Sequence, residues 1–369
     1  MNYEDKPREA CGIFGIHGHP EAARLSYFGL YALQHRGQES AGIAVLQNHN
    51  IVAHKGMGLV PEVFDISHMD ELKGQIAIGH VRYSTTGSSI LSNAQPLVVH
   101  HKSKSYAVAH NGNIVNAHIL KKELEESGSI LQTTMDTEIF LHLFVKNLNL
   151  GFEEALLETV RRIKGAFSMV LLTCKGEVIG LKDPNGFRPL CLGKLNGYYV
   201  LASESCALDL VEAEHIRELE PGEIVIISDE GVRSLNPHPQ TKRTLCIFEF
   251  IYFARPDSTI HGQNVYMTRK AHGRCLAREA PVDADLVMPF PDSGTYAALG
   301  YSEESGIPFE MGMIRNHYVG RTFIQPTQSM RDFGVRIKLN PVKELLQGKD
   351  IIIIVDSIIR GTTAKTRVK

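Results

Sequence analysis

The sequence predicts an α+β domain followed by an α/β domain with a parallel sheet. The chain has 369 residues, of which 43% are hydrophobic and 22% charged, and this composition and length suit about two globular domains. Strands with hairpin turns dominate the first 235 residues, whereas helical stretches alternate with short apolar runs after residue 250. Residues 236–243, between them, are polar and proline-rich. We therefore predict domains at 11–235 and 251–369, joined by a linker at 236–250.

Charge and hydropathy exclude several classes of protein. Lys and Arg number 39 against 41 Asp and Glu, so the excess of positive charge that nucleic-acid binding requires is absent. No apolar run approaches the roughly 18 residues of a membrane span, and the charged first ten residues lack the apolar core of an export signal. The six scattered cysteines suit a reducing compartment. We expect a soluble, cytoplasmic protein without nucleic-acid or membrane partners.

The elements of the first domain are predicted to be mostly antiparallel strands with two helices inserted. Residues 192–202 should fold back on themselves at Asn196-Gly197, a dipeptide suited to the positive φ angles of a type I′ turn. Apolar residues at helical spacing predict a helix at 138–148, and a second at 153–164 ends before a glycine that suits a C-cap.

The second domain is predicted to have helices near 266–280 and 295–305. Short apolar runs at 285–289 and 351–355 alternate with them, and the second run has the composition of a buried strand. Alternation of this kind is typical of a parallel sheet.

Cys11 is the first candidate for chemistry. It follows a short polar leader, residues 1–10, and opens an apolar strand-like run. If the leader is removed, the free amine of Cys11 can act as its base, because an α-amino group has a pKa of about 7.7–8.0 and a thiol about 8.5. The alternative is a small buried cysteine that only packs.

Three more candidate sites follow Cys11 in the first domain. Arg82, at the end of an apolar run, could bind a carboxylate with two hydrogen bonds. Asn111 and Gly112 could direct an amide and a backbone N–H at one oxyanion, and Asp136 could hold an ammonium group. Each has an ordinary alternative: a surface cation for Arg82, a hairpin turn for Asn111-Gly112 and a helix N-cap for Asp136.

In this order after Cys11, these residues resemble the class II glutamine amidotransferase domain of the N-terminal nucleophile superfamily. The resemblance covers residues 11–235, including 183–190 and 202–205. It implies an αββα sandwich in which the Cys11 thiol attacks the side-chain amide of glutamine.

The same resemblance implies a role for most of the other residues. Asn111 and Gly112 would stabilise the oxyanion, while Arg82 and Asp136 would bind the carboxylate and ammonium of L-glutamine. Arg36 lies in the family's signature loop and is assigned to the glutamine site without a stated role.

The second domain carries segments that can bind phosphate. The run 351–355 leads into Gly and hydroxyl residues, which offer backbone N–H and side-chain O–H groups to a phosphate. This string resembles the sugar-phosphate loop of type I phosphoribosyltransferases, residues 291–295 resemble their pyrophosphate loop, and residues 315–324 resemble their flexible loop. The residues that this resemblance assigns to phosphoribosyl pyrophosphate are Asp356, Ser357, Arg360, Gly361, Thr362, Thr363 and Arg321.

With both halves in this order, the whole chain resembles the amidophosphoribosyltransferase family. The resemblance implies that ammonia from L-glutamine displaces pyrophosphate from 5-phosphoribosyl pyrophosphate and gives 5-phosphoribosylamine, the first committed step of purine (IMP) biosynthesis. It also implies Mg²⁺ at Ser293 and Asp356, purine nucleotide inhibitors, and a homo-oligomer that is a tetramer or a dimer.

Three features depart from that family or leave a question. Val355 stands where the family has an acidic residue, and the sequence ends at Lys369, where relatives continue, so we interpret the second domain as truncated. Cys246 matches the first ligand of a [4Fe–4S] cluster in one branch, but members without clusters also carry cysteine there. The histidine pairs lack zinc spacing, and we predict no zinc.

Two other functions remain open on the sequence. One is the glutaminase half of another class II amidotransferase, making an amino sugar or asparagine, against which residues 291–295 and 356–363 argue. The other is a catalytically impaired module that senses phosphoribosyl pyrophosphate.

Overall fold

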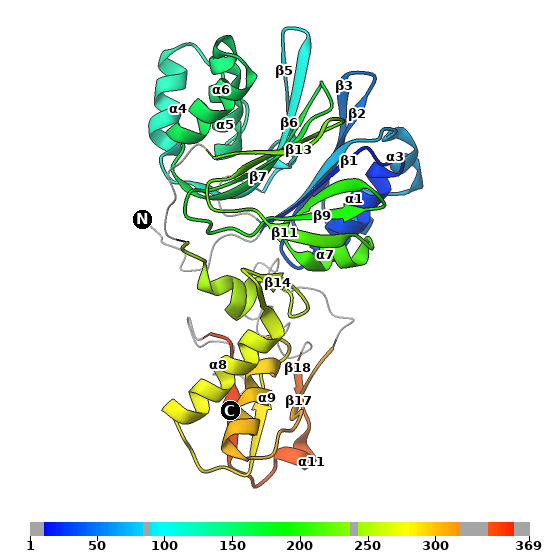
Figure 1. Ribbon diagram of the computed structural model, residues 1–369. Helices are drawn as coiled ribbons and strands as arrows, with labels where there is room; N and C mark the ends of the chain where they lie inside the picture. The colour runs from blue at the N-terminus through cyan, green and yellow to red at the C-terminus, as the bar shows by residue number, and fades with distance from the viewer. Residues whose placement is uncertain (1–10, 84–88, 237–242, 317–338, 358–369) are drawn as a thin grey trace. The chain divides into compact units, whose positions relative to one another are not determined.

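The chain folds into two compact units in a computed structural model (Figure 1). The structure describes residues 11–83, 89–236, 243–316 and 339–357. The first unit contains the described part of 11–246 together with 258–262, and the second contains 247–257 and the described part of 263–357. Of the predicted features, the leader 1–10, Arg321, Arg360, Gly361, Thr362 and Thr363 lie outside the described residues.

The first unit is a sandwich of two stacked antiparallel sheets. One has seven strands in the order β11-β9-β10-β1-β4-β2-β3, and the other has six in the order β13-β12-β8-β7-β6-β5. The strands are β1 (Gly12–His17), β2 (Ser40–Gln47), β3 (Asn50–Met57), β4 (Ala77–Arg82), β5 (Leu97–His101), β6 (Lys104–Ile114), β7 (Gly165–Thr173), β8 (Val178–Lys182), β9 (Cys191–Leu195), β10 (Tyr198–Ala202), β11 (Glu214–Glu218), β12 (Ile224–Ser228) and β13 (Gly231–Leu235), with the short β14 (Thr259–Ile260) added from 258–262.

Helices cover both outer faces of this sandwich. Figure 1 shows α4, α5 and α6 beside the six-stranded sheet and α1 and α7 beside the seven-stranded sheet. The helical segments are α1 (Ala22–Ala32), α2 (Val60–Val63), α3 (Ile66–Glu71), η1 (Leu91–Asn93), α4 (Ala117–Glu126), α5 (Asp136–Asn147), η2 (Leu148–Leu150), α6 (Phe152–Arg162) and α7 (Ser205–Leu210). The αββα arrangement implied by the resemblance is thereby confirmed.

Alternation along the strands builds the apolar layers of the sandwich. In β1, Ile13 belongs to the core between the sheets, whereas Phe14 and Ile16 belong to the core beneath α1. This alternation follows from the two-residue period of a strand, which sends successive side chains to opposite faces. Because both faces are covered by apolar layers, all six residues of β1 are buried.

The local predictions for the first unit agree with the structure. The helix expected at 138–148 is α5, which begins two residues earlier, and the helix expected at 153–164 is α6. The expected hairpin joins β9 to β10, and both Asn196 and Gly197 have positive φ angles, of 48° and 98°.

The second unit contains the predicted helices and a parallel strand pair. Strands β16 (Leu286–Pro289) and β19 (Ile351–Ile354) pair in parallel, and α8 (Val265–Glu279) and α9 (Thr295–Ser305) correspond to the expected helices. The other elements are η3 (Glu249–Phe253), β15 (Gln263–Asn264), β17 (Met313–Arg315), β18 (Leu339–Pro341) and α11 (Lys343–Leu346).

The strand β19 is less covered than its sequence predicts. Only Ile354 is buried, while the three preceding isoleucines are half-buried. Among the described residues β19 pairs with β16 alone, so it lies at an edge of the described sheet. The expectation of a fully buried strand is therefore wrong for this part of the structure.

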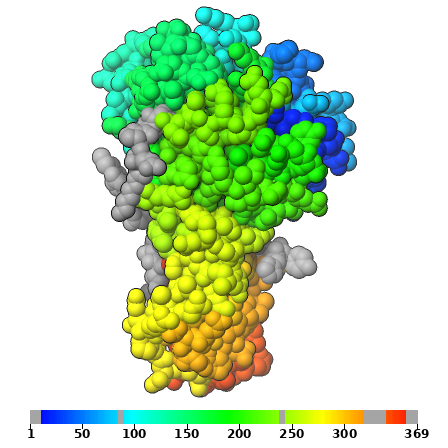
Figure 2. Space-filling view, viewed as in Figure 1, coloured from blue at the N-terminus to red at the C-terminus, as the bar shows by residue number. Residues whose placement is uncertain are grey.

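Helices α8 and α9 cross at backbone contact. A Cβ atom on Gly273 would lie 1.9 Å from the carbonyl oxygen of Ala297, and one on Gly300 would lie 1.9 Å from that of Lys270. Figure 2 shows the two helices, yellow and orange, side by side on one face of this unit. Only glycine at these two positions allows the crossing.

Candidate active site

Cys11 lies at the entrance to β1, between the signature loop and the end of β4. Its side chain is buried, and its Sγ donates to the carbonyl oxygen of Tyr83 at 3.6 Å. Gly12 pairs with Val81, so Cys11 lies beside the end of β4 that carries Arg82. The Nε of Arg36 donates to the Cys11 carbonyl oxygen at 3.0 Å. The nucleophile candidate and two of the predicted glutamine-site residues are therefore neighbours.

Arg36 is held from its other side by Glu204, which precedes α7. The guanidinium Nη1 donates to Oε1 of Glu204 at 2.5 Å, and Nε2 of His35 lies 2.7 Å from the same oxygen. Burial alone would raise the pKa of this carboxyl, but the charges of His35 and Arg36 and their hydrogen bonds lower it well below its usual range. Glu204 is therefore a buried carboxylate that binds two side chains of the signature loop.

Arg82 and Asp136 are both buried and lie close together. Nη2 of Arg82 lies 3.5 Å from Sδ of Met135, the residue before Asp136. Because Arg82 is only 1% exposed, the alternative of a surface cation is wrong. The N-cap of α5 is Met135, so the N-cap alternative for Asp136 is wrong as well.

The carboxylate of Asp136 is directed to β6. Its Oδ2 accepts from the backbone N–H of Ile114 at 2.7 Å, and its Oδ1 lies 3.5 Å from Nδ1 of His110. Burial raises the pKa of Asp136, but the charge of His110 and the hydrogen bonds outweigh it, so the pKa is lowered overall. The carboxylate is therefore an anion in a buried site.

Asn111 and Gly112 lie inside β6, not in a hairpin turn. They pair with Ser168 and Phe167 of β7, so the hairpin alternative is wrong. The Asn111 side chain is fully buried, and neither its Oδ1 nor its Nδ2 has a hydrogen-bond partner among the described residues. Gly112 has a φ of 142°, and a Cβ there would lie 2.1 Å from the Ala166 carbonyl oxygen. Because buried amides are seldom left unpartnered, Asn111 suits a ligand.

Two buried histidines fix this stretch of β6, and sequence reasoning gave them no role. Nε2 of His80 lies 3.0 Å from the carbonyl oxygen of His110. Burial lowers the pKa of His80 to about 3, so it is neutral at physiological pH and this nitrogen carries the proton that it donates. The His110 backbone N–H donates to Oε1 of Gln95 at 2.8 Å. The strand is therefore held on both sides immediately before Asn111.

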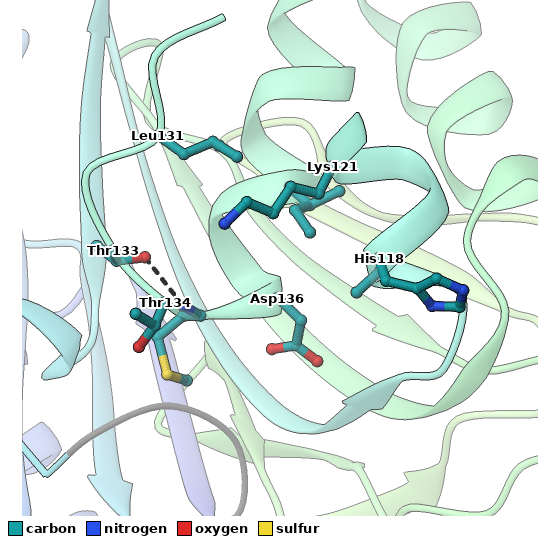
Figure 3. Close-up of a pocket in the computed structure, with 9 residues that line it drawn as sticks. His118, Lys121, Leu131, Thr133, Thr134 and Asp136 are labelled. Carbon is teal, nitrogen blue, oxygen red and sulfur yellow. Dashed lines mark hydrogen bonds between the residues drawn. The ribbon is translucent and has the colours of Figure 1, made fainter. Parts of the chain in front are cut away.

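A small cavity adjoins Asp136 on the helical side (Figure 3). It has a volume of about 100 Å³ and is lined by residues of α4, of α5 and of the segment before α5. Figure 3 shows Lys121 reaching from α4 toward the segment that carries Leu131 and Thr133, with Asp136 below it. A space of this size accepts a few waters or one small polar group.

In the second unit, the two predicted phosphate loops meet at the carboxyl ends of the parallel strands. The backbone N–H of Phe290 donates to the Ile354 carbonyl oxygen at 2.8 Å, and a Cβ on Gly294 would lie 2.3 Å from that same oxygen. Ser293 and Asp356 therefore lie on adjacent loops, at the edge where open α/β sheets bind ligands.

The donors at these loops suit a hard cation. The Ser293 hydroxyl and the Asp356 carboxylate are oxygen groups, which Mg²⁺ prefers, and both side chains are only half-buried. Asp356 Oδ1 accepts from the backbone N–H of Ser357 at 2.7 Å, and the neighbouring Asp292 pairs with Arg315. The described part of the chain has no group of three His, Cys, Asp or Glu residues placed to hold a metal, so most ligands would be water and phosphate oxygens.

Cys246 is half-buried and forms no disulfide bond. A [4Fe–4S] cluster takes four thiolates, and the described residues place no group of three or more His, Cys, Asp or Glu side chains around Cys246 that could hold a metal ion. Cluster ligation by Cys246 therefore stays a prediction. In the described residues there is also no helix with the length and apolar character of a membrane span.

Comparisons with known proteins cover both units. A model of the glutamine amidotransferase domain matches residues 80–210. Amidophosphoribosyltransferase 2, chloroplastic, of Arabidopsis thaliana is 50% identical over 372 residues, covering 100% of this chain and 66% of the relative. Amidophosphoribosyltransferase of Staphylococcus epidermidis is 50% identical, covering 98% of this chain and 73% of the relative. The chain thus spans about two thirds of the length of the chloroplastic relatives.

Two solved structures are also similar over almost the whole chain. One is glutamine phosphoribosylpyrophosphate amidotransferase from B. subtilis complexed with ADP and GMP, with 47% identity and a TM-score of 0.91, covering 97% of this chain and 78% of that one. The other is described as the allosteric regulatory enzyme of purine biosynthesis, with 48% identity, a TM-score of 0.92, and coverage of 97% and 77%.

Proposed function

Because the chain belongs to the amidophosphoribosyltransferase family, we propose that it transfers ammonia from L-glutamine to 5-phosphoribosyl pyrophosphate. The products are 5-phosphoribosylamine, glutamate and pyrophosphate, and the reaction is the first step of purine biosynthesis. The observation that carries the proposal is a 50% identity that extends through both units, in a chain whose first unit gathers Cys11, Arg36 and Arg82.

The glutaminase step begins with the Cys11 thiol. After removal of residues 1–10, the free amine of Cys11 takes the thiol proton and the sulfur attacks the side-chain amide carbon of glutamine. The proton then passes to the amide nitrogen, ammonia leaves, and a thioester remains on Cys11. Water hydrolyses the thioester and releases glutamate.

The oxyanion of each tetrahedral intermediate is stabilised by the Asn111 amide and the Gly112 backbone N–H. The unpartnered amide of Asn111 supports this role, since donors already aimed at the developing charge need no reorganisation. Arg82 binds the substrate carboxylate, and Asp136 binds its ammonium through the anionic form that its surroundings favour. Arg36 acts on the enzyme side, through the Cys11 carbonyl oxygen.

The phosphoribosyl step takes place at the loops after β16 and β19. Ser293 and Asp356 would hold Mg²⁺, which neutralises charge on the departing pyrophosphate. Ser357 and the Gly and Thr residues 361–363 would bind the 5-phosphate, with Arg360 and Arg321 adding positive charge. Ammonia from the first site attacks C1 of the ribose, the bond to pyrophosphate breaks, and one ammonium proton is lost.

We propose the regulation and assembly of this protein from its similarity to relatives. The B. subtilis structure is complexed with ADP and GMP, which supports purine nucleotides as inhibitors of this protein. We also propose a homo-oligomer, a dimer or tetramer, located in the cytoplasm. Iron analysis of a chain extended to the length of its relatives would test Cys246 as a cluster ligand.

A steady-state assay separates the proposed function from its rivals. Glutamate release and phosphoribosylamine formation are measured with and without phosphoribosyl pyrophosphate, in the given chain and in a chain extended to the length of its relatives. The proposal expects glutaminase activity in both and transfer in the extended chain. Glutamate release that ignores phosphoribosyl pyrophosphate would indicate another amidotransferase, and binding of phosphoribosyl pyrophosphate without either product would indicate a sensor.

A further inference from the structure

The carboxylate of Glu204 joins three segments that are far apart in the sequence: 35–36, 204–206 and 258. Oε1 receives hydrogen bonds from His35 and Arg36 of the signature loop. Oε2 accepts from Oγ of Ser258 at 2.7 Å, and Sγ of Cys206 lies 3.7 Å away. Both oxygens are therefore bonded, although the side chain is fully buried. A buried carboxylate with this many donors is held in one orientation.

The Glu204 carboxylate binds Arg36, which in turn binds Cys11, the proposed nucleophile. Arg36 touches the Cys11 carbonyl oxygen through Nε and Glu204 through Nη1, so one planar guanidinium connects the two. The residue before Glu204 contributes as well, because Oγ of Ser203 accepts from the backbone N–H of Ile13 at 2.9 Å. Cys11, through Arg36, and Ile13, directly, are thus bonded to the segment 203–204.

A nucleophile at a chain terminus needs such support more than one inside a chain. A residue within a chain is positioned by peptide bonds on both sides, whereas a terminal residue has one. Under the proposed chemistry Cys11 is that terminal residue, and its carbonyl oxygen is the nearest backbone group by which it can be held. Reaction rates are sensitive to such positioning, since a displacement of about 1 Å can cost roughly a hundredfold.

Ser258 brings a part of the chain from beyond the sandwich into this arrangement. Residues 258–262 belong to the first unit, although 257 and 263 on either side belong to the second. The Ser258 side chain is fully buried, and the next backbone N–H, of Thr259, donates to Oγ of Ser205 at 2.8 Å. The pentapeptide is therefore bonded to residues 204 and 205 at consecutive positions.

We propose that Glu204 is a positioning residue for the Cys11 nucleophile and acts through Arg36. The hydrogen bond from Ser258 helps to fix the Glu204 carboxylate in the orientation that binds Arg36. The inference rests on the proposed glutaminase chemistry and deepens it. It predicts that loosening Glu204 lowers the rate of thiol attack while leaving the binding of glutamine nearly unchanged, because Arg82 and Asp136 lie outside this network.

A second carboxylate in the same unit offers a matched control. Glu223 is also buried, receives two hydrogen bonds from Arg217 at 2.7 and 2.8 Å, and accepts from Oγ of Ser234 at 2.6 Å. It reproduces the Glu, Arg and Ser of the Glu204 network without a bond to Cys11. Glu223→Gln and Ser234→Ala therefore remove equivalent interactions at a place that should not affect catalysis.

The first comparison is Glu204→Gln against Glu223→Gln in the leaderless protein. Glu204→Gln should lower the glutaminase kcat about 10- to 100-fold with KM for glutamine within about threefold. Inactivation by an electrophilic glutamine analogue that alkylates Cys11 should slow by the same factor. Glu223→Gln should lower Tm by a similar amount and keep kcat within about twofold. Equal kcat losses in the two variants, or an unchanged kcat in Glu204→Gln, would overturn the inference.

Ser258→Ala tests the proposed network if Glu204→Gln does not fold. It removes one hydrogen bond to a charged group and should lower kcat about 3- to 10-fold, whereas Ser234→Ala should leave it unchanged. A Ser258→Ala protein with wild-type kcat and wild-type alkylation rate contradicts the role of Ser258. A wild-type protein that releases no glutamate contradicts the proposed function itself, so the two failures are distinguishable.

Discussion

The two candidate sites differ in how much of each is built by folding alone. Around Cys11, the side chains of Arg36, Arg82 and Asn111 are at most 1% exposed and lie between packed layers. At the loops of the second unit, Ser293 and Asp356 are only half-buried and stand at the ends of two strands. The first site is therefore largely built by folding, whereas the second leaves its polar side chains partly open to solvent.

This difference predicts which kinds of mutation each site should be sensitive to. A preorganised site loses rate when one buried group is removed, because its neighbours cannot rearrange to replace it. An open site built of loops and phosphate oxygens should respond more to the charge that the protein offers. The following predictions test that contrast, in order of expected size.

The largest effect is expected for Cys11→Ala. Loss of the thiol should lower glutamine-dependent activity by about a thousandfold or more. In a chain extended to the length of its relatives, ammonia-dependent formation of phosphoribosylamine should remain within about twofold of wild type. Parallel rate assays with glutamine and with ammonium chloride make the comparison. An equal loss in both assays would mean that the two sites are not separable.

Asn111→Ala should give the next largest effect and should sharpen the idea of a prebuilt site. Removal of an oxyanion donor costs about 10²–10³-fold in kcat. Because the Asn111 amide has no partner among the described residues, its loss should leave Tm unchanged or slightly higher. Glutaminase kinetics and thermal unfolding are measured on the same protein. A large fall in Tm would show that the amide stabilises the fold instead.

Val355→Asp tests the open site. Restoring an acidic residue beside Asp356 adds an anionic acceptor for a charge-assisted hydrogen bond, worth about 1.5–3 kcal/mol or a roughly 10- to 100-fold change in rate. The ammonia-dependent rate of the extended chain, at saturating magnesium, should rise by about that factor, with glutaminase chemistry unchanged. Equal rates for the two proteins would show that Asp356 alone is sufficient.

The smallest effect concerns the pH dependence of stability in the first unit. Burial holds the pKa of His80 at about 3 in the folded state, against about 6.5 when unfolded. As the pH falls below about 6.5, the unfolded chain binds a proton that the folded chain does not, so stability falls by about 1.4 kcal/mol per pH unit from this group. His80→Gln should therefore reduce the loss of stability between pH 6.5 and pH 5.

Urea unfolding at the two pH values measures this change. His215→Gln, at an exposed histidine of the same unit, is the control and should leave the pH dependence as in wild type. An identical pH dependence in wild type and His80→Gln would contradict the prediction. Since burial also lowers the pKa of His17, some pH dependence should persist in the variant.

Local pattern was sufficient for most of the fold. The apolar stripes predicted α5 and α6 to within two residues, and Asn196-Gly197 located a hairpin, because each signal depends on neighbours in sequence. The site was predictable through its resemblance to a family. Residue types alone left Arg82, Asn111 and Asp136 with ordinary alternatives. The structure rejects them because Arg82 is buried, Asn111 lies inside β6 and Met135 is the N-cap of α5.

The rest could not be predicted because it depends on long-range contacts. Arg36 and Glu204 are 168 positions apart, and Ser258 lies 54 beyond Glu204, so no periodicity connects them. One signal was available for Glu204: a carboxylate inside the mostly apolar run 198–208 must be paired if it is buried. Nothing local indicates that 258–262 leaves the second unit. The solvent exposure of β19 likewise depends on which strands flank it, not on its own four isoleucines.

The Glu204 network includes a residue that is made late in synthesis. The carboxylate obtains its last protein donor only when Ser258 has been made and has reached the sandwich. At about 5–20 residues per second, a ribosome takes roughly 10–50 s to travel from Cys11 to Ser258. Throughout that time the Glu204 carboxylate lacks the hydrogen bond from Ser258. If removal of residues 1–10 requires the complete network, the free amine of Cys11 forms only in chains that already contain Ser258.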